Sequence, residues 1–303
     1  MTGLTHGCSQ TLLPSRRSER STPDAEGDVN IAAAPGIVGR PGDVAIEPAR
    51  RRVRVMAGGA CVADSNDAVL VFERGITPRW YLPIGDARAD RLRANGRTTD
   101  TLGRGVSRWY DLTVGDTVIV DAAWDHPKPP PGCPPLEGLI SFEWNLMDAW
   151  FEEEDQAFVH PRDPYTRVDV LASSRHVVVE VDGTVLADTK RPMMLLETSL
   201  PTRYYIHPLD VRLDLLVPSE TFTWCPYKGR ASYWHAEVGK KLHRDLFWGY
   251  PAPFVAGQRV INHLCAFNEF ADITVDGTPL DRPDTKWAHG GPNASSSLAS
   301  DGP

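Results

Sequence analysis

Residues 79–90 read RWYLPIGDARAD, and residues 203–214 read RYYIHPLDVRLD. The second stretch lies 124 positions after the first, and the same offset holds without a gap from residue 63 to residue 127. Of these 65 aligned positions 16 are identical, whereas unrelated segments share about four at ordinary residue frequencies. A repeat of this length indicates a duplicated domain of roughly 110 residues, because solenoid repeats are much shorter.

Each copy carries the pattern of β-hairpins. In the second copy, the β-prone runs 177–181 (VVVEV) and 184–187 (TVLA) flank Asp182-Gly183, a dipeptide typical of two-residue hairpin turns. The first copy has Gly58-Gly59 at the same place, between 53–56 and 60–63. Further turns are predicted at Gly115-Asp116, Gly239-Lys240 and Asp276-Gly277.

The fold class follows from the lack of strand–helix alternation, which argues against a parallel α/β sheet. Only 136–146 and 256–267 are compatible with short helices. We therefore predict a mainly β protein with two tandem copies of a small antiparallel β domain. The flanking segments lack any apolar period and are predicted to be disordered. The expected organisation is a disordered tail at 1–48, copy 1 at 49–151, a linker at 152–172, copy 2 at 173–286 and a disordered tail at 287–303.

The composition limits the classes of partner. The 303 residues include 40 acidic and 32 basic side chains, a formal net charge of −8, which disfavours bulk attraction to nucleic acid. No apolar run approaches the roughly 20 residues of a membrane-spanning helix. No secretory signal pattern is present, so a cytoplasmic location is expected. The cysteines are odd in number and without C-x-x-C spacing, which predicts free thiols; they are Cys8, Cys61, Cys133, Cys225 and Cys265.

The densest candidate for chemistry is the stretch 225–229, which reads CPYKG. A lysine three residues after a cysteine favours the nucleophilic thiolate, and Pro226 with Gly229 predicts a tight turn. The alternative is an ordinary β-turn with a half-buried thiol. Copy 1 reads TLGRG at 101–105, so the thiol is lost while the positive charge remains. If Cys225 is a nucleophile, only copy 2 is active; if the loop only binds an anion, both copies work.

A second constellation is present in both copies. Arg203 and Tyr205 share a face if they lie on a strand, and so do Asp210, Arg212 and Asp214. Such groups form either an ion-paired lattice or a polar pocket that clamps a carboxylate or phosphate, and both interpretations stay open. The candidate binding residues are Glu197, Arg203, Tyr205, Asp210, Arg212 and Tyr233, of which the first five match Glu73, Arg79, Tyr81, Asp86 and Arg88.

Other signals are weak. His160 and Asp163 lie among prolines that fix the backbone of the predicted linker, which makes them plausible site residues. The spacing of the histidines offers no ready metal site. No dinucleotide, phosphate-loop or nucleophile-elbow motif is present. The sequence therefore predicts no metal and identifies no cofactor.

The run from Arg203 through CPYKG to ASYW at 231–234 resembles the Domain of Unknown Function 427 family, and the resemblance covers about 53–280, including HPRDPY at 160–165. The resemblance implies a small, mostly antiparallel β fold and no settled substrate. Some classifications label that family nucleotidyltransferase-like. The chain lacks the Gly-Ser motif with paired aspartates that metal-dependent nucleotidyltransferases use, and copy 1 departs from the family's Cys-Pro-Tyr/Phe-Lys-Gly stretch.

Three hypotheses of function follow. The leading one is an enzyme acting on a small polar or anionic metabolite, with catalytic Cys225, Lys228 stabilising its thiolate or binding the substrate, Arg203 clamping an anionic group, and Glu197 or Asp210 orienting it. The second is a non-catalytic ligand-binding or interaction module. The third is nucleotidyl transfer. A small-molecule ligand is the expected partner, with no nucleic acid and no membrane; the oligomeric state stays open.

Overall fold

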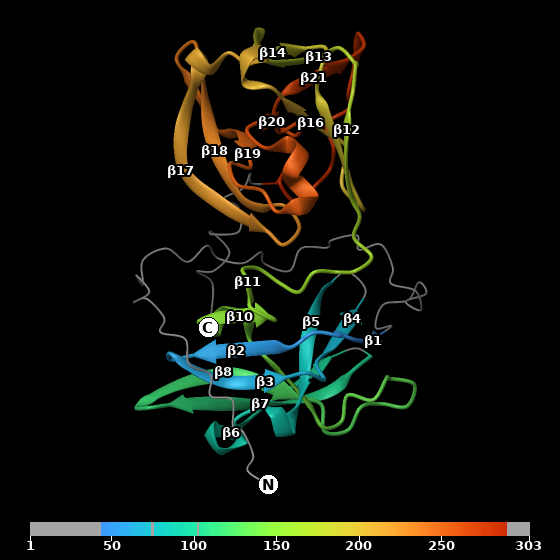
Figure 1. The fold of residues 1–303 in the computed structure, drawn as a ribbon, viewed down its shortest axis with the longest axis vertical. Coiled ribbons are helices and arrows are strands. Elements are labelled where there is room, and N and C mark those ends of the chain that lie inside the picture. Colours follow the sequence, from blue (N-terminus) through green and yellow to red (C-terminus); the bar gives the residue numbers. More distant parts are fainter. Residues whose placement is uncertain (1–43, 74–75, 102, 290–303) are drawn as a thin grey trace. The chain divides into compact units, whose positions relative to one another are not determined.

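The computed structural model of the chain describes residues 44–73, 76–101 and 103–289 (Figure 1). These residues divide into two compact units, one ending at Pro161 and the other beginning at Arg162. Each unit contains a seven-stranded and a four-stranded antiparallel sheet. Within the described residues, no helix has the length and apolar character needed to cross a membrane.

The strands of the first unit are β1 (Val44–Pro48), β2 (Val53–Ala57), β3 (Ala60–Ser65), β4 (Val69–Glu73), β5 (Ile76–Pro83), β6 (Leu92–Thr101), β7 (Gly105–Val114), β8 (Thr117–Asp125), β9 (Leu139–Phe142), β10 (Ala149–Glu152) and β11 (Asp155–Ala157). Those of the second are β12 (Val168–Ala172), β13 (Val177–Val181), β14 (Thr184–Thr189), β15 (Met193–Glu197), β16 (Arg203–Ile206), β17 (Leu216–Cys225), β18 (Gly229–Val238), β19 (Lys241–Gly249), β20 (Leu264–Ala266), β21 (Asp272–Val275) and β22 (Thr278–Pro279).

The two units share one topology. The large sheets run β1-β4-β5-β9-β8-β7-β6 and β12-β15-β16-β20-β19-β18-β17, and the small ones β11-β10-β2-β3 and β22-β21-β13-β14. Each strand of the first unit thus has a counterpart in the same place in the second. The prediction of a mainly β protein with two tandem antiparallel domains is confirmed.

The predicted hairpins form because their turn residues adopt positive φ. Asp182 and Gly183 have φ of 48° and 77° and join β13 to β14, and Gly58 and Gly59 have φ of 56° and 73° between β2 and β3. Positive φ at both central residues is the geometry of the turns that match the twist of paired strands. The other three predicted turns are also present, between β7 and β8, β18 and β19, and β21 and β22.

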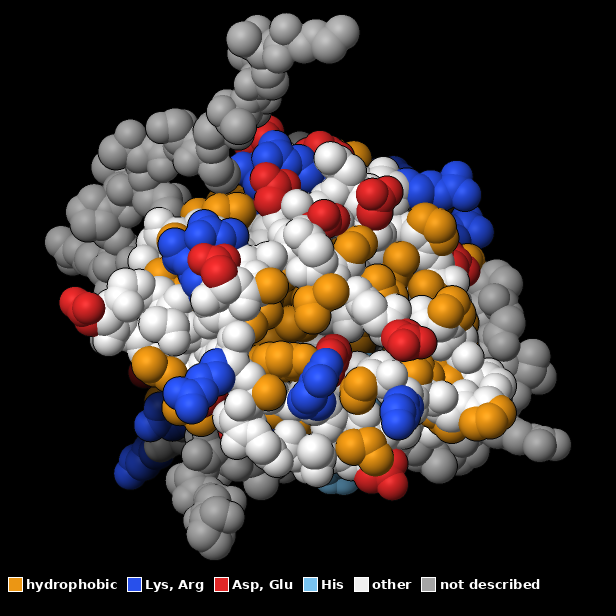
Figure 2. All heavy atoms as spheres, turned by 90° about the horizontal axis from the view of Figure 1, so that it is seen from below, with side chains coloured by type: hydrophobic (Ala, Val, Ile, Leu, Met, Phe, Trp, Pro, Cys, Tyr) orange, Lys and Arg blue, Asp and Glu red, His pale blue; other side chains and the backbone are white. Residues whose placement is uncertain are grey.

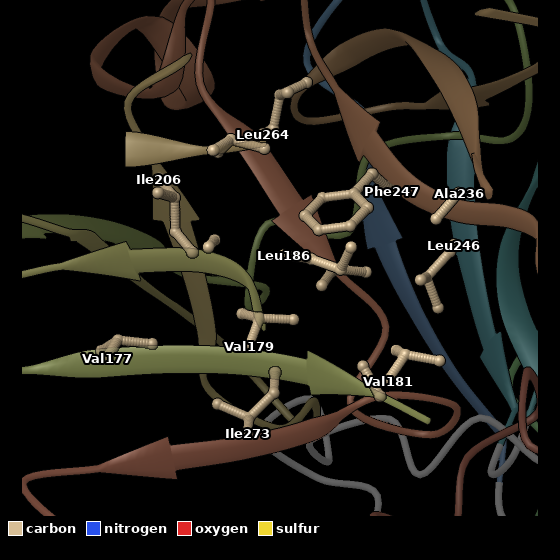
Figure 3. Close-up of a cluster of buried hydrophobic side chains, with 14 of the residues drawn as sticks. Val177, Val179, Val181, Leu186, Ile206, Ala236, Leu246, Phe247, Leu264 and Ile273 are labelled. Atoms are coloured by element: carbon tan, nitrogen blue, oxygen red, sulfur yellow. The ribbon is translucent and has the colours of Figure 1, made fainter. Parts of the chain in front are cut away.

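The core of the second unit has two parts, because its large sheet is buried on both faces. The first part joins the large sheet to the small one, where Val177, Val179 and Val181 of β13 belong to one buried cluster with Phe247 (Figure 3). Ile206 of β16 belongs to this part, whereas Tyr205 beside it belongs to the second part. Successive residues of a strand point to opposite faces. The second part is an aromatic cluster, defined by Tyr205, Tyr233, Trp248, Tyr250, Cys265 and Phe267 with their aliphatic neighbours.

Two stretches predicted as helices are mostly not helical. Residues 136–146 contain β9 and only a short 3₁₀ turn (Trp144–Leu146), and 256–267 contain β20 after a 3₁₀ turn (Val255–Val260). Both strands are interior members of the large sheets, and β20 lies between β16 and β19. A strand buried on both faces loses its apolar–polar alternation, so it is hard to distinguish from a buried helix by pattern.

The predicted boundaries also miss the first strand of each copy. Val44–Pro48, within the predicted tail 1–48, pairs with β4, and Val168–Ala172, within the predicted linker 152–172, pairs with β15. Trp287, at the start of the predicted C-terminal tail, packs against Phe267, with ring centres 6.2 Å apart. These are two edge strands and one tryptophan, which leave little pattern in the sequence. The remainder of both predicted tails, 1–43 and 290–303, lies outside the described residues.

Charges of both signs lie side by side on the surface. Figure 2 shows, on one face, Lys and Arg side chains next to Asp and Glu and separated by apolar side chains. On the surface of the described residues, opposite charges form ion pairs, such as that of Arg212 with Asp214 at 2.6 Å. Such exposed pairs contribute little to stability.

Candidate functional site

The CPYKG stretch forms the tight turn that the sequence predicts. Cys225 ends β17, Gly229 begins β18, and the two residues pair across the turn. Gly229 has φ of 97°, and a Cβ there would lie 3.3 Å from Ala252 O and Phe254 N. Phe254 N donates a hydrogen bond of 3.0 Å to Lys228 O. Only glycine combines this φ with so close a backbone approach.

The proline-flanked segment 160–165 braces the turn from outside. Arg162 Nε donates a hydrogen bond of 2.9 Å to Pro226 O, and Asp163 N donates one of 2.9 Å to Tyr227 Oη. Burial raises the pKa of Tyr227 to about 12. Asp163 is thus placed beside Tyr227, where it supports the turn, while His160 contacts the carbonyl of Pro161.

Lys228 points from the turn into the sheet, where its ammonium group donates a hydrogen bond to Glu197 Oε2 of β15. Both side chains are only 8% exposed. Burial alone would lower the pKa of Lys228, but the acidic groups of Cys225, Glu197 and Tyr205 outweigh it and raise the pKa. Lys228 is therefore a charged ammonium whose charge Glu197 balances.

Protonated hydroxyl and thiol groups surround this pair. Trp248 Nε1 donates a hydrogen bond of 2.9 Å to Tyr205 Oη. Burial raises the pKa of Tyr205 and Tyr250 well above the usual range and also raises that of Cys265. Cys225 is half-buried and packs against the aromatic cluster, whereas Cys265 is 1% exposed. Of these two thiols, Cys225 is the more exposed.

Tyr233 belongs to the same cluster. Its hydroxyl lies 2.8 Å from Thr223 Oγ1 of the neighbouring strand. Its ring stacks on Phe267, with ring centres 6.5 Å apart and planes inclined by 10°. Tyr233 is thus held in one orientation beside the strand that ends at Cys225.

Arg203 is already bound by a carboxylate that the sequence did not suggest. Its guanidinium donates two hydrogen bonds, of 2.8 and 2.5 Å, to Glu269, which also accepts one of 2.6 Å from Thr285 Oγ1. Burial opposes ionisation of Glu269, but Arg203 prevails and lowers its pKa. The guanidinium also lies over three aromatic rings, those of Trp248, Phe267 and Trp287 at 5.4, 5.8 and 5.6 Å.

Asp210 and Arg212 lie apart from these groups, and the predicted strand face is wrong. They sit in and beside two 3₁₀ turns (Pro208–Asp210 and Leu213–Leu215), where residues no longer alternate between faces. Asp210 accepts two hydrogen bonds of 2.9 Å from Arg191, which with Thr189 lowers its pKa to about 2. Arg212 pairs with the exposed Asp214. For these two residues the lattice interpretation fits.

Copy 1 repeats the buried base and its glutamate. Arg104 pairs with Glu73 at 2.8 Å and donates a hydrogen bond of 2.9 Å to Tyr81 Oη. Trp124 Nε1 donates a second hydrogen bond of 2.9 Å to the same oxygen. His126 Nε2 lies 3.2 Å from it. The glutamate, base, tyrosine and tryptophan are therefore common to both copies.

Sequence reasoning missed Glu269, Tyr250 and His126. Glu269 lies 66 positions from Arg203, so no local pattern joins them. A signal did exist for the others, because Tyr250 and His126 each follow by two positions the tryptophan shared by the copies. Within 44–73, 76–101 and 103–289, no group of three or more His, Cys, Asp or Glu side chains is arranged to hold a metal ion.

Comparison with known proteins agrees with this duplicated architecture. A search of curated proteins finds no match to the chain. A family model described as a domain of unknown function, with a short name that refers to nucleotide transfer, matches residues 45–153 and 169–277. These two ranges cover the large sheet and all but one strand of the small sheet in each unit, and most of the chain. The chain thus belongs to the DUF427 family and contains two tandem copies of its domain.

Proposed function

We propose that copy 2 is an enzyme domain that acts on a small polar metabolite, with Cys225 as its nucleophile. The observation that carries this proposal is the position of Cys225: a half-buried thiol at the end of β17, three residues before the buried Lys228 in the same tight turn. A positive charge beside a thiol favours the thiolate, which is the reactive form.

The protonation states of the neighbouring side chains decide which group can accept the proton of Cys225. Lys228, Tyr205 and Tyr250 all hold their protons at neutral pH, so none of them accepts the proton of the thiol. That proton leaves to water at the exposed side of Cys225. The thiolate then forms a bond to an electrophilic carbon, whose carbonyl electron pair moves onto oxygen. Lys228 stabilises that oxyanion, and its collapse expels the leaving group.

The charge balance favours an uncharged polar substrate over an anionic one. Lys228 is shared between Glu197 and the Cys225 thiolate, and Arg203 is paired with Glu269, so no positive charge remains for an anionic group of the substrate. An anionic group would have to displace a buried carboxylate from its base, which costs several kcal/mol. Arg203 therefore serves to position the aromatic rings above which it lies.

Acyl transfer from p-nitrophenyl acetate tests this function without knowledge of the natural substrate. After incubation, mass spectrometry of the peptides is expected to find acetyl on Cys225, and Cys225→Ser to release p-nitrophenol no faster than buffer. Cys61→Ser, which changes a half-buried thiol of copy 1, serves as the matched control. Equal release by wild type and Cys225→Ser would remove the proposal.

The pairing of both bases also favours a second candidate, a non-catalytic binding module in which the thiol is incidental. It predicts that Arg203→Ala abolishes ligand binding while Cys225→Ala leaves it unchanged. Nucleotidyl transfer is supported by the family's short name alone. It requires nucleotide and divalent-metal binding, so a flat calorimetric titration with ATP and Mg²⁺ would exclude it.

A further inference from the structure

Copy 1 keeps the glutamate, base, tyrosine and tryptophan of the buried site but has different side chains around them. Where copy 2 has Lys228, Tyr250 and Gly257, copy 1 has Arg104, His126 and Cys133. Arg104 acts electrostatically on Cys133, although burial prevails and raises the pKa of this thiol. A thiol near the buried base is therefore present again, supplied by the loop after β8 and not by the turn that carries Cys225 in copy 2.

His126 is a neutral hydrogen-bond donor in this site. Its side chain is fully buried and stacks on Tyr81, with ring centres 6.0 Å apart. Tyr81 Oη already accepts hydrogen bonds from Arg104 and Trp124, so its own proton points to His126 Nε2. The ring proton of His126 then lies on Nδ1. Burial, assisted by Arg104 and only partly opposed by Asp125, lowers the pKa of His126 to about 4.

Two buried donors of this cluster contact no hydrogen-bonding partner among the described residues, His126 Nδ1 and Arg104 Nε. An unpaired buried donor destabilises the fold, and native structures contain few of them. His126 is fully buried, and within the described part of the chain only its Nε2 has a hydrogen-bonding partner, so the unpaired Nδ1 contributes nothing to the stability of the fold. The same unpaired donor can bind an acceptor atom of a ligand.

We propose that copy 1 holds a second binding site, for an uncharged ligand that presents a carbonyl or amide oxygen to His126 Nδ1. The ligand is uncharged because Glu73 balances Arg104, His126 is neutral and Cys133 is protonated, so a buried anion would lack a counter-charge. Loop 127–138 (PKPPPGCPPLEG) packs against Tyr81 and Trp124 through Leu136, so entry requires it to move. This site is independent of Cys225 and of the activity proposed for copy 2.

Acetamide and acetate form a matched pair of probes, because they share size and shape and differ in charge. The wild-type full-length chain, with its histidines isotope-labelled and assigned through the backbone, is titrated with each at constant ionic strength. Acetamide is expected to shift the ring signals of His126 saturably in the millimolar range. It should also slow the alkylation of Cys133 at least twofold while leaving that of Cys225 unchanged. Acetate should do neither.

Tyr205→Phe, which makes the same change at the position of copy 2 that matches Tyr81, is expected to leave the His126 response intact. Tyr81→Phe removes the donor to Nε2 and should abolish the response. An unsaturable response to acetamide, or an equal response to acetate, overturns the proposal. Both results are measured on residues of copy 1, so they can be distinguished from a failure of the function proposed for copy 2.

Discussion

Lys228 and Arg104 occupy equivalent positions in the two copies. Lys228 pairs with Glu197 and Arg104 pairs with Glu73, and these two glutamates are also at equivalent positions. Cysteine, by contrast, has changed place between the copies, from Cys225 in one to Cys133 in the other. The ion pair is thus common to both copies, whereas the thiols near it come from different segments.

Glu197→Gln is expected to lower the free energy of unfolding by about 3 kcal/mol, because it leaves the ammonium group of Lys228 buried without its counter-charge. Urea denaturation measures the loss. The double variant Glu197→Gln/Lys228→Met should recover much of it. Arg212→Gln, which breaks an exposed ion pair, is the control and should change little. If Glu197→Gln and Arg212→Gln lowered the free energy of unfolding equally, the buried pair would contribute no more to stability than the exposed one.

Arg203→Met is expected to destabilise the protein by about 3 kcal/mol at pH 7, because it strands the carboxylate of Glu269 in the core. Arg203 lowers the pKa of Glu269, so the stability that the pair contributes is present above the unfolded-state pKa near 4.5 and is lost as the pH falls. The difference between wild type and variant should therefore shrink below pH 4.5. A difference independent of pH would contradict this account of Arg203.

Gly229→Ala should destabilise the turn more than Gly183→Ala does. Both glycines have positive φ, but a Cβ at Gly229 meets backbone atoms at 3.3 Å, while one at Gly183 meets nothing within 4 Å. Strain from φ alone costs about 1 kcal/mol, and the steric clash adds to it at Gly229. Thermal unfolding of both variants makes the comparison. Equal losses would mean that the segment at 252–254 yields freely.

His126 predicts a pH dependence with a defined sign. Its pKa is about 4 in the folded chain against 6.5 as the ordinary value, so the unfolded chain binds more protons between these pH values. Stability therefore falls as the pH drops from 6.5 to 4, by about 3 kcal/mol in total. His126→Phe should flatten this slope in urea denaturation, and His289→Gln, at an exposed position, should not. An unchanged slope in His126→Phe would show that another group is responsible.

The fold could be read from the sequence wherever a pattern repeats. The offset of 124 predicted the duplication, and Asp182-Gly183 predicted its hairpin, because both signals are local or self-comparing. The interior strands β9 and β20 were mistaken for helices, since burial on both faces removes the alternation that identifies a strand. The edge strands β1 and β12 lay outside the predicted domains for lack of such a pattern.

The candidate site could be predicted only in part. Cys225, Lys228, Glu197, Arg203, Tyr205 and Tyr233 do gather around the aromatic cluster of copy 2, although the sequence placed them in two separate constellations. Asp210 and Arg212 do not, because two 3₁₀ turns replace the expected strand. Glu269 was beyond reach, since its pairing with Arg203 joins residues from β16 and from the segment after β20, which only the tertiary fold brings together.

The central claim is that Lys228 activates Cys225. The most direct measurement is the alkylation of the native chain by iodoacetamide at pH 7, with each cysteine peptide quantified by mass spectrometry in wild type and in Lys228→Met. Cys61 is a half-buried thiol in the same sample and provides the internal control. The account predicts that Cys225 reacts several-fold faster than Cys61 and that Lys228→Met removes this advantage. A Cys225 that reacts no faster than Cys61, or equally fast with and without Lys228, would contradict it.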